Sequence, residues 1–267
     1  MRIFVIPITR SQWALHCHPA NVTPTRLSRW AQTASEKWNN WAHHPKDSWR
    51  GRVHSYGERM MDKIDFKEYF MKEVPTKAEG AMIGQVDIIA PRFLDSSDIL
   101  KQLRTLAEER EPYHSRWMKL SAYCLPFTAL FSLVPFVPNF PMFYNIFRIY
   151  SHYKAKHGAH HLAHLLHSGS IEVVNDSGMD QWYNGGAVSQ QDTPVVGCES
   201  DDGYSTFDGG LDQSSIENGV PLLESPPMVS DEDLAQMAVY FGLPMLEPSV
   251  RRARHQIIAA LSKERGE

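Results

Sequence analysis

Cysteine is scarce in this chain of 267 residues, which has three cysteines and no pair in a C-x-x-C arrangement. A small secreted fold held together by disulfides is therefore excluded. No H-E-x-x-H sequence occurs either, so the usual motif of hydrolytic zinc sites is missing. The Gly-Gly pair at 185–186 gives no nucleotide-binding signal, because no strand pattern precedes it and no helix pattern follows.

Positive charge is absent from a long segment near the C-terminal end of the chain. Residues 168–250 contain 15 acidic residues and no Lys or Arg, whereas residues 1–167 contain 22 basic and 14 acidic ones. Residues 251–267 are basic again, with five Lys or Arg against two acids. The net charge of −4 conceals this partition, which indicates segments in different environments.

The first 35 residues contain no acid, and four arginines lie among many Ser and Thr residues. This composition is typical of mitochondrial import signals, although an ordinary basic N-terminus remains an alternative. A secretory signal is disfavoured, because the apolar run at 3–8 is too short for the apolar region of such a signal and Pro7 interrupts it. We expect at most a short strand, at residues 3–6.

Apolar residues at helical spacing predict a mainly α fold. Thr23 followed by Pro24 is typical of a helix start, and the helix that follows carries tryptophans at 30, 38 and 41, for which core packing is favoured over a membrane interface. Further helices are predicted over residues 53–71 and from Ser96 to Pro112.

Charge is absent from residues 120–147, a stretch of 28 residues with basic and aromatic residues on both sides. It is long enough to span a bilayer, but four prolines within it argue against a straight helix: Pro126, Pro135, Pro138 and Pro141. Three arrangements remain open: one kinked membrane span, a re-entrant or monotopic hairpin turning at 135–141, and a buried hairpin of a soluble core. The stretch has no Asp, Glu, Lys or His, so proton coupling would need residues outside it or a partner protein.

A histidine face follows directly, on a predicted amphipathic helix. Its histidines fall on one side and its leucines on the other. Some pairs have the i, i+4 spacing at which two imidazoles reach one metal ion, which makes four of them weak candidates for metal ligands: His157, His160, His161 and His164. A weakly basic face towards water or headgroups is the favoured interpretation, with pH sensing as a second one, and we expect no bound metal.

Residues 168–229 are rich in Ser, Gly, Asp and Pro and predict a disordered acidic linker. Order is expected to return at Ser230, a helix N-cap, with Gly242 and Pro244 ending that helix and a last helix starting near Ser249. The chain thus divides into a basic helical region (1–119), the apolar segment with the histidine face (120–167), the linker (168–229) and a C-terminal helical hairpin (230–267).

The central segment resembles the fungal mitochondrial potassium–proton (K+-H+) exchange-related family. An apolar P-x-x-P-N segment leads into N-x-x-R-x-Y-x-H and then a helix with a small residue and a glycine. The matching positions are Pro135, Pro138, Asn139, Asn145, Arg148, Tyr150, His152, Ala155 and Gly158. Weaker similarity occurs at the N-terminus, through Phe4 and Pro7, and at the C-terminal hairpin; together it covers about 1–165 and 230–260.

This resemblance implies a place at the mitochondrial inner membrane, in contact with its lipids and in a complex with other inner-membrane proteins. It also implies a part in potassium/proton homeostasis and offers no catalytic residues to transfer. Because the uncharged stretch contains no titratable group, we expect an accessory or regulatory component of the exchange rather than a complete exchanger. We expect no enzymatic activity, no cofactor and no nucleic-acid partner. A scaffold protein of the inner membrane, docking through the tryptophan helix and the C-terminal hairpin, is the alternative. A soluble metalloenzyme built on the histidine face is a third possibility with little support.

Overall fold

A computed structural model describes residues 1–9, 11–20, 22–130, 139–168, 171–184 and 229–264. The chain is mainly helical with one small sheet, which confirms the predicted fold class in its coarse form. The strands are β1 (Arg2–Pro7), β2 (Trp13–His18), β3 (Val86–Ala90) and β4 (Ile171–Asn175). The helices are α1 (Arg26–Asn40), the 3-10 helix η1 (Trp41–His43), α2 (Trp49–Met61), α3 (Phe66–Glu73), α4 (Ser96–Leu130), α5 (Phe140–Ser168), α6 (Ser177–Asn184), α7 (Asp231–Tyr240) and α8 (Leu246–Glu264).

The sheet has the order β2-β1-β3-β4, with β1 antiparallel to β2 and the other neighbours parallel. The sequence predicted only β1, whose uninterrupted apolar run suits a strand covered on both faces. The other three strands are five or six residues long and carry polar residues, so their pattern is hard to distinguish from that of a loop.

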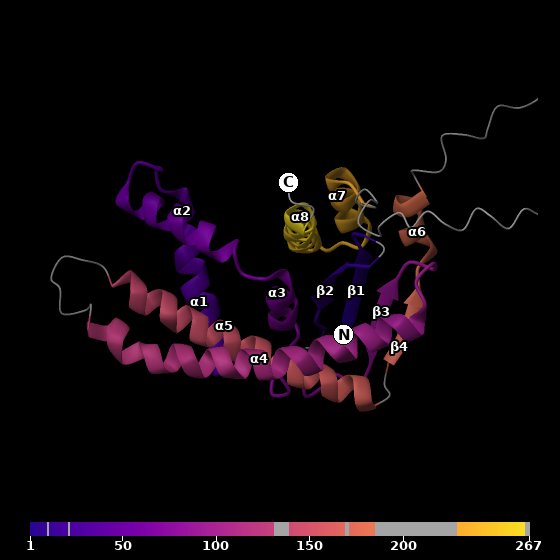
Figure 1. Ribbon diagram of the computed structural model, residues 1–267, viewed down its shortest axis with the longest axis horizontal. Helices are drawn as coiled ribbons and strands as arrows, with labels where there is room; N and C mark the ends of the chain where they lie inside the picture. Colours follow the sequence, from indigo (N-terminus) through magenta and orange to yellow (C-terminus); the bar gives the residue numbers. More distant parts are fainter. Residues whose placement is uncertain (10, 21, 131–138, 169–170, 185–228, 265–267) are drawn as a thin grey trace, which may run out of the picture.

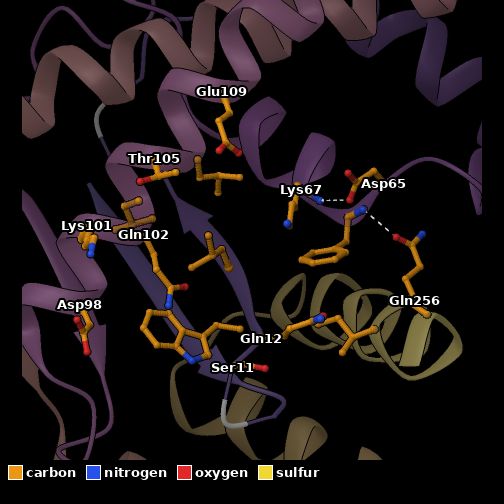
Figure 2. Close-up of a pocket in the computed structure, with 17 residues that line it drawn as sticks. Ser11, Gln12, Asp65, Lys67, Asp98, Lys101, Gln102, Thr105, Glu109 and Gln256 are labelled. Carbon is orange, nitrogen blue, oxygen red and sulfur yellow. Dashed lines mark hydrogen bonds between the residues drawn. The ribbon is translucent and has the colours of Figure 1, made fainter. Parts of the chain in front are cut away.

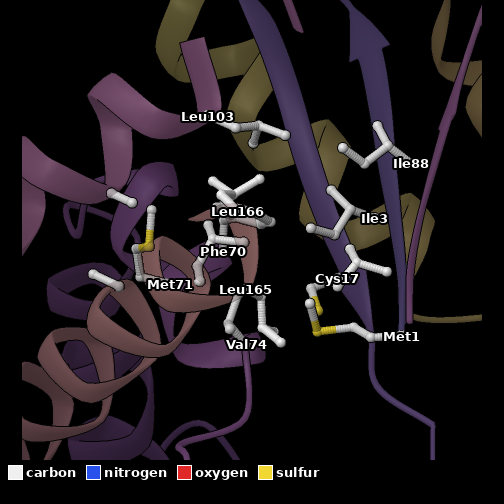
Figure 3. Close-up of a cluster of buried hydrophobic side chains, with 14 of the residues drawn as sticks. Met1, Ile3, Cys17, Phe70, Met71, Val74, Ile88, Leu103, Leu165 and Leu166 are labelled. Atoms are coloured by element: carbon white, nitrogen blue, oxygen red, sulfur yellow. The ribbon is translucent and has the colours of Figure 1, made fainter. Parts of the chain in front are cut away.

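Helices cover both faces of the sheet (Figure 1). On one face Ile3 and Val5 of β1 pack with residues of α3, α4 and α5, among them Phe70, Leu103 and Leu166 (Figure 3). On the other face the alternate residues of β1 pack with α6, α7 and α8, as the period of two along a strand requires. These alternate residues are Phe4 and Ile6.

The residues whose composition resembles an import signal include this central strand. The amino group of Met1 donates a hydrogen bond to the carbonyl of Gln85 at 3.0 Å, and Arg2–Pro7 lies between β2 and β3. Removal of these residues would therefore open the middle of the sheet.

Helices α4 and α5 form a long antiparallel hairpin. Asn145 donates to the carbonyl of Ser121 near one end, and Arg104 donates to the carbonyl of Leu166 near the other. The predicted stop at Pro112 was wrong, because α4 continues through Pro112 and Pro126. Both prolines lie on the exposed face of α4, where water can satisfy the carbonyl that each leaves without a donor.

The uncharged stretch is consequently divided between two helices, and the single kinked span was wrong. Among the helices in the described part of the chain, none combines the length and the apolar character needed to cross a bilayer. The predicted membrane-spanning hairpin is thus unsupported. Pro135 and Pro138, with most of the predicted turn, lie outside the described residues.

The tryptophan stripe was assigned to a core, and this was wrong. Helix α1 begins after its N-cap Thr25, two residues later than predicted, and none of its residues is buried. Trp30 is 59% exposed, while Trp38 and Trp41 pack on each other with ring centroids 5.8 Å apart. The predicted helix over 53–71 is two helices, α2 and α3.

The acidic linker begins later than predicted. Strand β4 pairs with β3, and α6 follows it, so part of the segment predicted to be disordered is folded. Met179 and Trp182 explain this difference, because they bury apolar side chains against β1 and α7 that the low average hydrophobicity concealed. Residues 185–228 of the predicted linker lie outside the described residues.

The C-terminal hairpin is confirmed, with a capping box at Ser230 and Gly242 at a positive φ of 65°. Its last helix starts at Leu246, three residues earlier than predicted. The buried residues of α7 and α8 pack on the sheet. The hairpin therefore covers the chain's own core, and its apolar face is not free for a partner.

Replacing Met179 with alanine tests the packing of α6. The side chain is fully buried, so we expect the free energy of unfolding to fall by about 2–5 kcal/mol in urea denaturation. The control Val239→Ala, at a residue 82% exposed, should change it by less than about 0.5 kcal/mol. Equal effects in the two variants would contradict the placement of α6.

Candidate functional site

A buried polar cluster lies where α3, α4 and α5 meet. Glu68 comes from α3, His114 from α4, and Arg148, Ser151 and His152 from α5. Positions 148, 151 and 152 share one side of α5 because they are three and four residues apart. Glu68, His114, Ser151 and His152 are at most 3% exposed. We name these five residues the junction cluster.

An ion pair between Glu68 and Arg148 forms one half of the junction cluster. The guanidinium donates to both carboxylate oxygens, at 2.8 and 3.3 Å, and Ser151 Oγ donates to Oε1 at 2.7 Å. Burial of Glu68 opposes ionisation, but the Ser151 hydrogen bond and the Arg148 charge outweigh it and hold the pKa of this carboxyl below its usual value. Glu68 is therefore ionised at neutral pH.

Two imidazoles form the other half. An Arg148 N–H donates to His152 Nε2 at 2.9 Å, so His152 is neutral and carries its proton on Nδ1. That proton points to His114 Nδ1, 3.1 Å away, which leaves the proton of His114 on Nε2. This Nε2 is buried and has no hydrogen-bond partner.

The electrostatics of the cluster keep both rings neutral. Burial lowers the pKa of His114 to about 4, and the neighbouring His152 acts in the same direction. Burial followed by the Arg148 charge lowers the pKa of His152 to about 4 as well. Both imidazoles therefore present uncharged ring nitrogens to each other at neutral pH.

Three cluster residues could hold a metal ion. Within the described ranges, Glu68, His114 and His152 are the one group of three potential ligands whose atoms all lie within 4.8 Å of one another. The histidines of the predicted face do not form such a group. His157 donates to the Tyr153 carbonyl, His161 is buried and donates to the Pro75 carbonyl, and His160 and His164 are exposed.

The motif positions of the resemblance lie mostly on the inner side of α5. Asn145, Arg148 and His152 face α3 or α4, and the amide of Asn145 joins the hairpin helices through Ser121 and Thr128. Near the start of α5, Asn139 donates to the Thr128 carbonyl and accepts from the Met142 backbone. Tyr150 is half-buried, and burial raises the pKa of its phenol.

Gly158 allows α3 to approach α5. A Cβ atom at this position would lie 2.0 Å from the Met71 carbonyl oxygen, closer than any contact that real structures accept. Glycine is therefore required there by the backbone of α3, and this close approach brings Glu68 to Arg148.

Sequence reasoning missed Glu68 and His114, because each lies far along the chain from the α5 motif. One signal existed: no acidic residue occurs between Glu111 and Glu172. A partly buried arginine in α5 must therefore take an acidic partner from a distant segment.

A separate cleft of about 690 Å³ lies beside the junction, between β2, α3, α4 and α8 (Figure 2). Its rim carries side chains of both signs, among them Asp98, Lys101 and Glu109. The Phe66 backbone N–H donates to Gln256 at 2.9 Å at one side. These groups do not converge on one chemical feature, so the junction cluster remains the candidate site.

Comparison with known proteins identifies the family. The profile described as "Mitochondrial K+-H+ exchange-related" matches residues 2–166. The chain belongs to this family. The match includes the junction cluster and confirms the resemblance of the first 165 residues, whereas the resemblance of the C-terminal hairpin lies outside it. Mitochondrial association and involvement in K+–H+ exchange follow from the family. No curated protein and no solved structure matches the chain.

Replacing Gly158 with alanine should lower the free energy of unfolding by about 1–3 kcal/mol, because α3 must move away from α5. Gly84→Ala is the control, since a Cβ there meets no atom within 4 Å. Chemical denaturation of the two variants measures the difference. A Gly158 variant as stable as the control would show that the two helices are not in close contact.

The Glu68–Arg148 pair can be tested by a double-mutant cycle. Arg148→Met leaves a buried carboxylate unpaired and should cost about 3–5 kcal/mol of stability. Adding Glu68→Gln should recover part of this loss, because the uncompensated charge is removed. For comparison, Glu247 and Arg251 form a partly exposed pair whose coupling should be below about 1 kcal/mol. Equal coupling in the two cycles would argue against a buried pair.

Proposed function

We propose that this protein is an accessory or regulatory component of potassium/proton exchange at the mitochondrial inner membrane. Family membership supports the process and the organelle. The observation that carries the rest of the proposal is the distribution of polarity along the α4–α5 hairpin. His114, Arg148 and His152 of the hairpin are engaged at the junction cluster, and the far end of the hairpin exposes apolar side chains.

The hairpin end, defined as residues 117–130 of α4 and 140–147 of α5, exposes many large apolar side chains. They are Trp117, Leu120, Tyr123, Phe127, Leu130, Phe140, Phe143 and Tyr144, with Tyr123 and Phe127 at 74% and 70% exposure. Monomeric soluble proteins rarely leave contiguous apolar patches of this kind uncovered. The hairpin end is therefore suited to contact with another hydrophobic phase or surface.

Charge favours the lipid interface as that surface. The hairpin end lies within the segment without acidic residues, is preceded by Arg116 on α4 and contains Lys119 near its start. Aromatic side chains flanked by cations are typical of segments that lie at the headgroup level of anionic membranes. A contact of this type requires no spanning helix.

The position of the titratable groups favours an accessory role. A protein that carries protons across a membrane places acids or histidines along the path, and residues 120–147 contain no Asp, Glu, Lys or His. The histidines nearest to this stretch along the chain, His114 and His152, belong to the junction cluster and hydrogen-bond to each other. We infer that ion movement takes place in a partner and that this chain docks beside it.

The alternative is an inner-membrane scaffold without a transport role. It is favoured by the exposed aromatic residues of α1 and α2, where Trp30, Trp49 and Tyr56 are 59%, 54% and 66% exposed. These helices have one buried residue between them, Gly51. They would present a second contact surface for a protein partner.

Swelling of isolated mitochondria in potassium acetate tests the proposal. Mitochondria that lack the protein should swell more slowly, and the full-length chain should restore the rate. A Phe127→Ser/Phe143→Ser variant should fail to restore it, because its hairpin end no longer favours the interface. Val239→Ser, at an exposed apolar residue of α7, is the matched control and should restore swelling fully.

Unchanged swelling in mitochondria lacking the protein would remove the exchange role. If partners then co-purify with the wild-type chain but not with a Trp30→Ser/Trp49→Ser variant, the scaffold function is supported instead. A Phe127/Phe143 variant that restores swelling as well as the control would show that the hairpin end is not used.

A further inference from the structure

We propose that Glu68, His114 and His152 bind one divalent transition-metal ion of the zinc class at the junction of α3, α4 and α5. This site shares no residue with the histidine face predicted from the sequence. It also goes beyond the proposed role in exchange, because it depends only on the geometry of the cluster. The ligands would be one carboxylate oxygen and the Nδ1 atom of each imidazole.

The distances support a shared ion. The two Nδ1 atoms are 3.1 Å apart, and Glu68 Oε2 lies 4.0 Å from His152 Nδ1. Two ligand atoms of a tetrahedral zinc ion, each bonded at about 2.0–2.1 Å, are separated by roughly 3.3 Å. The imidazole pair thus already has nearly the separation required, and a small movement of the Glu68 side chain would complete the group.

The donor set selects the class of metal. Imidazole nitrogens suit zinc, copper, iron and nickel, whereas magnesium and calcium prefer sites made of oxygen atoms. Two histidines and one glutamate leave a fourth position, which a water molecule can fill. Because each ligand comes from a different helix, a bound ion would connect all three.

Arg148 competes with the metal. Its N–H to His152 Nε2 keeps the ring proton on Nδ1, the atom that a metal would need free. Metal binding therefore moves the His152 proton to Nε2 and displaces one guanidinium nitrogen. Arg148 can make this movement, because its side chain is 18% exposed and its other nitrogen can remain on Glu68.

This competition gives the proposal a specific signature. Loss of the guanidinium should tighten metal binding, since it frees His152 Nδ1 and leaves the Glu68 carboxylate without its cation. An adventitious site on exposed histidines would not respond to Arg148. Without a metal ion, the Arg148 guanidinium thus supplies the positive charge that the ion would otherwise supply.

The experiment uses the purified full-length chain, stripped with a chelator and titrated with zinc in a calorimeter. We expect one saturable step of one ion per chain. His152→Gln and His114→Gln should weaken it by about tenfold or more, and Arg148→Met should tighten it by about tenfold, as expected for loss of a charge-assisted hydrogen bond. The control, His160→Gln/His164→Gln, removes an exposed i, i+4 pair and should leave the step unchanged.

A second measurement tests the proposal even if the histidine variants fail to fold. Zinc should raise the melting temperature of the Arg148→Met chain more than that of the wild type, because the ion replaces the lost partner of Glu68. The proposal is overturned if the wild type shows no saturable step. It is also overturned if the step is lost in the His160/His164 control, or if Arg148→Met weakens binding.

Discussion

The ion pair between the buried Glu68 carboxylate and the partly buried Arg148 guanidinium is the interaction on which the rest of the structure depends. Removing two charges from water is costly, and such a pair is tolerated only with good geometry and further hydrogen bonds. Ser151 and the two carboxylate contacts supply these bonds. The same guanidinium fixes the proton positions of both imidazoles, and the pair can form only because Gly158 lets α3 approach α5.

The sheet gives this junction a rigid base. β1 lies in its middle and packs α3, α4 and α5 on one face and α6, α7 and α8 on the other. Segments far apart in sequence therefore meet around the first strand: β3 and β4 pair beside it, and the C-terminal hairpin covers its second face. The position of the junction consequently depends on segments from both ends of the chain.

The two ends of the α4–α5 hairpin differ in the polarity of the side chains that they bury and expose. At the sheet and the junction the helices bury apolar residues and a satisfied ion pair, whereas the hairpin end exposes aromatic residues in a segment without acids. One end is thus fixed to the body, and the other leaves apolar side chains exposed. This division of one element into an anchored part and an exposed apolar part is the basis of the accessory role that we propose.

The sequence by itself determined the helical character, the capped C-terminal hairpin and the family, because 3.6-residue periodicity, caps and the α5 motif are local patterns. It also named Asn145, Arg148 and His152 as motif positions, and their spacing puts them on one side of a helix once α5 forms. Only the tertiary structure decided that the first strand is central, that β4 and α6 are folded, and that the tryptophan stripe lies outside the core. It alone brought Glu68 and His114 to Arg148, because residues more than 30 positions apart meet only through packing, which no local pattern encodes.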